Sequence, residues 1–180
     1  MVIRRTIGLG AAASSILMVC AGCFSTSEPS ASAGEPDDAA ARCLTADDAD
    51  EMADRVLQLV NLERGEAGLP PVLPDPTLMK IAGDYGCKMI EDGFFGHYDP
   101  DDGRGPAERA VARRYRFYAV GENLAAGQQT AAEAMRVWME SPSHKSIILD
   151  ERWTEVGVAV RFGGEHGVYW VQEFGDPAGY

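Results

Sequence analysis

The stretch EVGVAVRFGGEHGVYWVQEF, residues 155–174, decides the fold class of this 180-residue chain. Val156, Val158 and Val160 alternate with other residues, which is the period of a strand that buries one face. The glycine-rich segment 163–167 interrupts the pattern, and a second apolar run follows at residues 168–174. We therefore expect a β-hairpin near the C-terminal end.

The sequence before this hairpin has the period of helices. Apolar residues at helical spacing predict a first helix from about Asp47, with Arg64 among the polar residues around it, and a second helix that stops at Gly93. A short helix is expected from Pro106, and another follows Thr130, a residue that caps helix N-termini. Helices around a small, mainly antiparallel sheet predict an α+β sandwich.

The first 45 residues are expected to lie outside the folded domain. Arg4 and Arg5 precede a short apolar run, which is typical of a signal peptide over residues 1–22. Ala21 and Gly22 directly before Cys23 resemble the lipobox of bacterial lipoproteins, in which the cysteine is lipidated. An ordinary secretory signal cleaved elsewhere is the alternative. Residues 23–45 predict a lipidated cysteine and a flexible tether, and residues 46–180 the folded domain.

Two further cysteines remain for the folded part of the chain. Once Cys20 and Cys23 are assigned to the signal, Cys43 and Cys87 remain as an even pair in an oxidising compartment, so we predict one disulfide. Two buried free thiols are the alternative. A two-cysteine metal site is disfavoured because Cys43 and Cys87 do not form a CxxC motif.

The charge of the chain argues against one class of partner. Its formal net charge is −12, and no basic stripe with interleaved aromatic residues is present. Such a surface repels phosphate backbones, so nucleic acid is excluded as a partner. The expected state is an exported monomer in the cell envelope, either lipid-anchored, with the outer membrane favoured, or secreted.

Few residues are suited to chemistry. Of three histidines, His97 follows an aromatic pair, His144 follows Ser141 and a proline, and His166 lies in the expected hairpin turn. Glu122 stands in an apolar stretch beside a glycine. A buried acid requires a partner, which predicts a histidine or a metal ion beside it.

Together these segments resemble the CAP superfamily, the module of cysteine-rich secretory, antigen-five and plant pathogenesis-related proteins. The order of motifs carries the resemblance, namely GH (96–97), GENLA (121–125), Trp138 with SPSH (141–144), EVGV (155–158), and YWVQ (169–172) with FG (174–175). It covers residues 50–176. It implies a three-layer α-β-α sandwich with a concave cleft, in which two histidines and two acids bind zinc or another divalent ion in several members.

Residue by residue, His97 matches the first family histidine and Glu122 the acid of the GEN motif. The second histidine of eukaryotic members falls on Tyr169, so His144 is the candidate second imidazole. The second acid falls near Ser141. Candidates for additional cleft residues are Glu140, Ser141, Tyr169, Gln172 and Glu173, although Gln172 and Glu173 face opposite sides of a regular strand.

The resemblance leaves three functions open. The favoured one is a non-enzymatic domain that binds a lipid, small molecule or protein in its cleft. A metal-dependent or His/Glu-assisted hydrolase is the alternative, since two imidazoles and a carboxylate suit Zn²⁺ with an open position for water. Ser141 or Ser143 near His144 is the corresponding serine-hydrolase version. The third function is a structural envelope module.

Overall fold

The computed structural model describes residues 42–179. Its elements follow in the order α1 (Ala49–Glu66), β1 (Leu73–Pro74), α2 (Pro76–Glu91), α3 (Pro106–Ala112), β2 (Phe117–Ala126), α4 (Ala131–Glu140), α5 (Pro142–Ile148), β3 (Glu155–Gly163) and β4 (Gly167–Pro177).

The strands form one sheet in the order β1-β3-β4-β2. The expected hairpin is confirmed: β3 and β4 are antiparallel neighbours around the turn at residues 163–167. β4 also pairs antiparallel with β2, and the two-residue β1 adds a parallel pair to β3. The sequence predicted no strand at residues 117–126, and this prediction was wrong. β2 forms one edge of the sheet.

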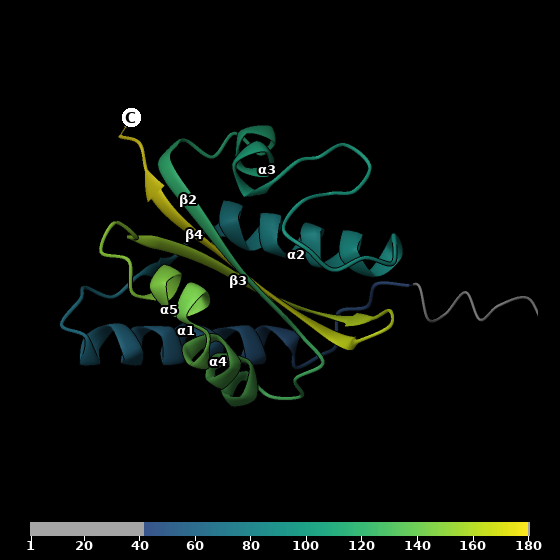
Figure 1. Cartoon of the computed structure of the whole chain (residues 1–180), viewed down its shortest axis with the longest axis horizontal. Helices are drawn as coiled ribbons and strands as arrows, with labels where there is room; N and C mark the ends of the chain where they lie inside the picture. The colour runs from purple at the N-terminus through teal and green to yellow at the C-terminus, as the bar shows by residue number, and fades with distance from the viewer. Residues whose placement is uncertain (1–41, 180) are drawn as a thin grey trace, which may run out of the picture. The chain divides into compact units, whose positions relative to one another are not determined.

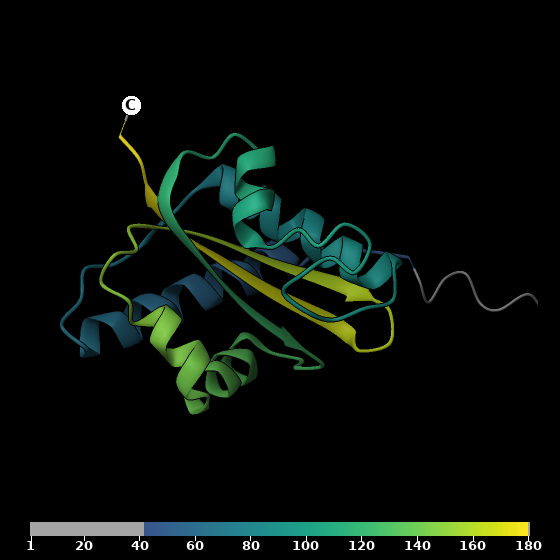
Figure 2. The ribbon, with the colours of Figure 1, turned by 45° about the horizontal axis from the view of Figure 1, so that its top comes forward.

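Helices cover both faces of this sheet (Figures 1 and 2). α2 and α3 lie on one side, and α1, α4 and α5 lie on the other. Trp138, Trp170 and Phe174 fill the core on the α1/α4 side, whereas Tyr85 and Val171 pack on the α2 side. The three-layer α-β-α sandwich is therefore confirmed.

Local sequence explains where two of the helices start. Asp75 caps α2, its carboxylate accepting from the N–H groups of Thr77 and Leu78. The predicted cap of α4 is confirmed, because Thr130 and Glu133 form a reciprocal capping box. The chain after Ser141 forms a further helix, α5, which the sequence did not predict.

α2 lies close against the sheet at a glycine. A Cβ atom added to Gly157 of β3 would stand 2.0 Å from the backbone carbonyl carbon of Leu78. Only glycine permits this approach. The residue at position 157 therefore sets the distance of α2, and of the loop that follows it, from the sheet.

The position of Arg64 differs from the prediction. The sequence predicts it among the polar residues around the first helix, yet it is fully buried. Its guanidinium donates to the carbonyl oxygens of Pro70, Ile148, Asp150 and Trp153. A buried arginine is tolerated when its donors are satisfied in this way, and here it joins the end of α1 to the α5–β3 loop.

The predicted disulfide is confirmed. Cys43 and Cys87 are bonded, with their Cα atoms 5.0 Å apart, and Leu44 pairs with Phe162 beside them. Ordered contacts therefore begin before residue 46. The predicted signal peptide, Cys23 and most of the tether lie outside the described residues. Within residues 42–179, none of the helices has the length and apolarity required to cross a membrane.

Candidate functional site

The structure brings His97 and Glu122 together. His97 follows α2, Glu122 lies on β2, and Nδ1 of the imidazole is 2.7 Å from Oε1 of the carboxylate. The His97 side chain is 45% exposed, whereas that of Glu122 is 1% exposed. A carboxylate can only accept this hydrogen bond, which assigns a proton to Nδ1, and Nε2 makes no hydrogen bond within the described residues.

The backbone that carries His97 is held from α2 and α3. The Tyr85 hydroxyl donates to the Gly96 carbonyl oxygen at 2.5 Å. Arg109 of α3 donates to the His97 carbonyl oxygen at 3.1 Å and to that of Arg104 at 3.2 Å. The histidine therefore stands on a fixed loop, as an oriented catalytic or binding group requires.

The second acid of the cluster is Glu173. It is the cross-strand neighbour of Glu122 in the β2–β4 ladder and is 2% exposed. Burial, and next the negative charge of Glu122, raise the pKa of Glu173 well above its ordinary value. Glu140 is instead exposed and pairs with Arg136 along α4, so it is not part of the cluster.

Arg109 connects the two acids. Its guanidinium donates to Oε2 of Glu122 and lies 3.5 Å from Oε1 of Glu173. Sequence reasoning did not single out this residue, because PAERAVA (106–112) has the pattern of an ordinary charged helix. The sequence did indicate that a buried Glu122 requires a partner. It did not indicate that this partner lies 13 residues earlier, at Arg109.

His144 stands apart from this cluster. Its carbonyl oxygen accepts from the amide of Asn123, which also donates to Gln172. Burial, and next the charge that His97 carries when it is protonated, lower the pKa of His144. Within the described residues no hydrogen bond joins His144 to His97 or Glu122, and Nδ1 of His144 is buried without a hydrogen-bond partner.

The other candidate residues lie elsewhere in the fold. Gln172 faces the opposite side of the sheet from Glu173, as the strand period predicts. Tyr169 is buried in the core, where it contacts Phe95 and His166. Ser141 lies 3.1 Å from Ser143, hydroxyl to hydroxyl, and no hydrogen bond of the described chain joins either serine to a histidine.

A cleft of about 360 Å³ opens beside the His97–Glu122 pair. Its lining is mainly apolar or aromatic, with His97 and Glu122 among its few polar groups. The lining residues are His97, Tyr98, Pro106, Ala107, Val120, Gly121, Glu122 and Ile147. This volume is in the range of small-molecule sites.

The donor set does not fit the zinc site that the resemblance implies. A catalytic zinc takes three protein ligands. Both oxygens of Glu122 are already engaged, one by His97 and the other by Arg109. Among residues 42–179, no three side chains of His, Cys, Asp or Glu are grouped as a metal site requires. We therefore derive no chemistry through a metal ion.

Comparison with known proteins places this architecture in a family. A model of the cysteine-rich secretory protein family, CAP, matches residues 57–174. YkwD, an uncharacterized protein of Bacillus subtilis, is 34% identical over 120 residues, which are 67% of this chain and 45% of YkwD. The chain thus spans less than half the length of that relative.

Solved structures agree with the assignment. An outer surface protein of Borrelia burgdorferi has a TM-score of 0.68 at 22% identity, over 76% of this chain and 98% of that one. An extracellular SCP-domain protein of Bacillus anthracis has a TM-score of 0.64 at 25% identity, over 73% and 44%. NaASP2, solved with Zn²⁺, shares only the fold, with a TM-score of 0.51 at 14% identity over 81% and 85%. Because the family match takes in His97, Glu122 and the C-terminal hairpin, the chain belongs to the cysteine-rich secretory protein (CAP) family.

Proposed function

We propose that this protein is an exported CAP domain that binds a ligand in the cleft beside His97. The observation that supports the proposal is the combination of an apolar cleft of about 360 Å³ with one half-exposed imidazole held by a buried carboxylate. Sites with apolar walls and few fixed polar groups are typical of ligand pockets.

The walls indicate the kind of ligand. Pro106 and Ala107 of α3 line the cleft together with Val120 of β2 and Ile147 of α5. An apolar body lies against these side chains, and a polar group lies against Nε2 of His97. A lipid, a small molecule or a protein segment with an apolar side chain satisfies this requirement.

The fluorescent apolar probe anilinonaphthalene sulfonate tests the proposal. We expect saturable binding to the unaltered protein, because the aromatic body of the probe matches the apolar walls of the cleft. Ala107→Trp fills the cleft and should weaken binding about tenfold or more, equivalent to roughly 1.4 kcal/mol. Ala132→Trp, at an exposed position of α4, is the matched control and should bind as the unaltered protein does. Equal binding by both variants would contradict the proposal.

Hydrolysis is the second candidate, and the His97–Glu122 pair favours it. A carboxylate that accepts from Nδ1 orients an imidazole as a general base. In a hydrolase, His97→Ala should abolish turnover of p-nitrophenyl acetate while the protein stays folded. In the binding module that we propose, His97→Ala leaves any slow background turnover unchanged and retains most probe binding.

We also propose that the protein works outside the cytoplasm as a monomer, anchored to a membrane through Cys23 or secreted, without nucleic acid as a partner. The predicted signal sequence and the confirmed disulfide support export. Two structural relatives described as an outer surface and an extracellular protein support the same location.

A further inference from the structure

Two buried carboxylates share one side of the sheet. Glu122 of β2 and Glu173 of β4 are cross-strand partners, and they are 3% and 2% exposed. Like charges placed together away from water are unfavourable unless a cation or a proton compensates them. A compensating group is therefore required at this position.

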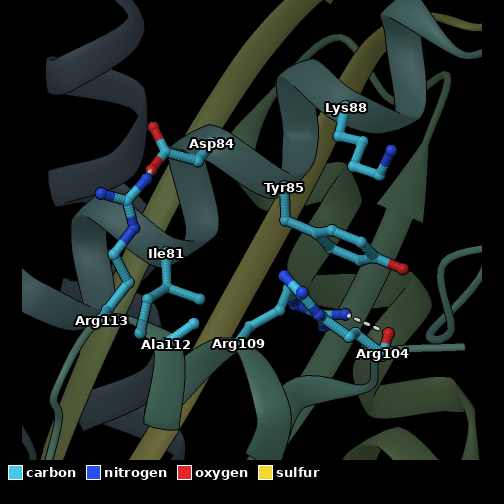
Figure 3. Close-up of a pocket in the computed structure, with 8 residues that line it drawn as sticks. All are labelled: Ile81, Asp84, Tyr85, Lys88, Arg104, Arg109, Ala112 and Arg113. Carbon is cyan, nitrogen blue, oxygen red and sulfur yellow. Dashed lines mark hydrogen bonds and ion pairs between the residues drawn. The ribbon is translucent and has the colours of Figure 1, made fainter. Parts of the chain in front are cut away.

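Arg109 supplies the positive charge, and it is fixed from several directions. One terminal nitrogen contacts both carboxylates, and the other donates to the carbonyl oxygens of His97 and Arg104. The guanidinium carbon lies 3.4 Å from the centre of the Tyr85 ring, and Figure 3 shows the two groups stacked. The Arg109 side chain is only 12% exposed.

This arrangement conflicts with a divalent ion at the same carboxylates. An ion bound by Glu122 would displace Arg109 or His97 from its oxygens and would stand beside a fixed guanidinium. Arginine stays protonated under all ordinary conditions, so the repulsion is permanent. We infer that Arg109 is the resident cation of the cluster formed by His97, Glu122 and Glu173, and that it makes this CAP cleft independent of metal.

Replacement of Arg109 should turn the cluster into a metal site. Arg109→Met removes the charge at similar length and frees His97, Glu122 and Glu173, which are not grouped as a metal site while Arg109 lies between them, to close on a divalent ion that displaces the Glu173 proton. With Co²⁺ as the probe, we expect no visible absorption band from the unaltered protein and one bound equivalent in Arg109→Met. The double variant Arg109→Met/Glu122→Gln should lose that equivalent.

Two matched controls isolate the charge at this position. Arg109→Lys keeps a positive charge and should remain without a Co²⁺ band. Arg104→Met removes a charge from the pocket in Figure 3, but Arg104 pairs with Asp102 and not with the buried acids. Arg104→Met should therefore also show no Co²⁺ absorption band. A cobalt band in either control equal to that of Arg109→Met would overturn the inference.

The unaltered protein provides an independent measurement if Arg109→Met does not fold. Its thermal unfolding midpoint should be the same in excess ZnCl₂ and in EDTA. A midpoint raised by zinc, with the rise abolished by Glu122→Gln, would show that a metal binds despite Arg109 and would refute the inference. Ligand binding in the cleft is a separate property, because the probe experiment above requires no metal.

Discussion

Glu173 and Glu122 lie side by side on β4 and β2, yet only Glu122 accepts from both His97 and Arg109. The contact of Glu173 with Arg109 is longer, at 3.5 Å, and a side-chain hydrogen bond with Glu122 adds to its raised pKa. Burial and the neighbouring carboxylate therefore favour the protonated form of Glu173, and its pKa is raised. Glu173 therefore keeps its proton to a higher pH than an ordinary glutamate does.

A glutamate with a raised pKa makes folding stability depend on pH. The folded protein keeps the Glu173 proton to a higher pH than the unfolded chain does. Stability is therefore full below the ordinary value of 4.5 and falls as the pH rises toward the raised value. The loss is about 1.4 kcal/mol for each pH unit between the two pKa values. Glu173→Gln should remove this loss and be more stable than the unaltered protein at neutral pH.

Urea unfolding of the two proteins at pH 5 and at neutral pH measures the effect. Glu140→Gln is the control, since Glu140 is exposed and pairs only along α4, and it should follow the unaltered protein. If the difference between Glu173→Gln and the unaltered protein were the same at both pH values, Glu173 would titrate normally in the folded state.

At the scale of elements, the disulfide fixes the segment before α1 onto α2. Cys43 and Cys87 are 44 residues apart, and the crosslink restricts the unfolded chain. In the chain-entropy model a loop of this length contributes about 4 kcal/mol. We expect Cys43→Ser/Cys87→Ser to lower the free energy of unfolding by about this amount. Urea denaturation measures it.

The unaltered protein under reducing conditions should approach the stability of the double variant. The Leu44–Phe162 pairing should also weaken, which hydrogen exchange at these two amides would detect. Unchanged unfolding midpoints in the variant would mean that α2 and the sheet hold this segment without the crosslink.

For the whole molecule, the expectation to test is membrane attachment. Expressed in a bacterium that processes lipoproteins, the unaltered protein should partition into the detergent phase of Triton X-114, because a lipidated Cys23 carries apolar chains. Cys23→Ala should move to the aqueous phase. Cys20→Ala, three residues away, should stay with the detergent. If the unaltered protein itself were found in the aqueous phase, the ordinary secretory alternative would hold.

The sequence by itself determined the features that depend on near neighbours. The valine alternation predicted the β3–β4 hairpin, and Thr130 predicted the start of α4, since both signals act within a few residues. Counting cysteines was enough to pair Cys43 with Cys87 because only two remained. Motif order gave the family, and with it the layers of the fold.

Only the tertiary structure decided the composition of the cluster. The apolar residues of segment 117–126 have no clear period. The segment forms the strand β2 because it pairs with β4. Arg109 reaches Glu173 across 64 residues of sequence, and Glu140 turns to solvent instead. The periodicity of apolar residues indicates on which face of its own helix or strand a residue lies, and capping residues indicate where a helix begins. Which faces meet is set by the packing of α3 and the loop after α2 against the sheet. That packing placed His97 and Arg109 beside Glu122, for which the sequence had predicted a histidine or a metal ion.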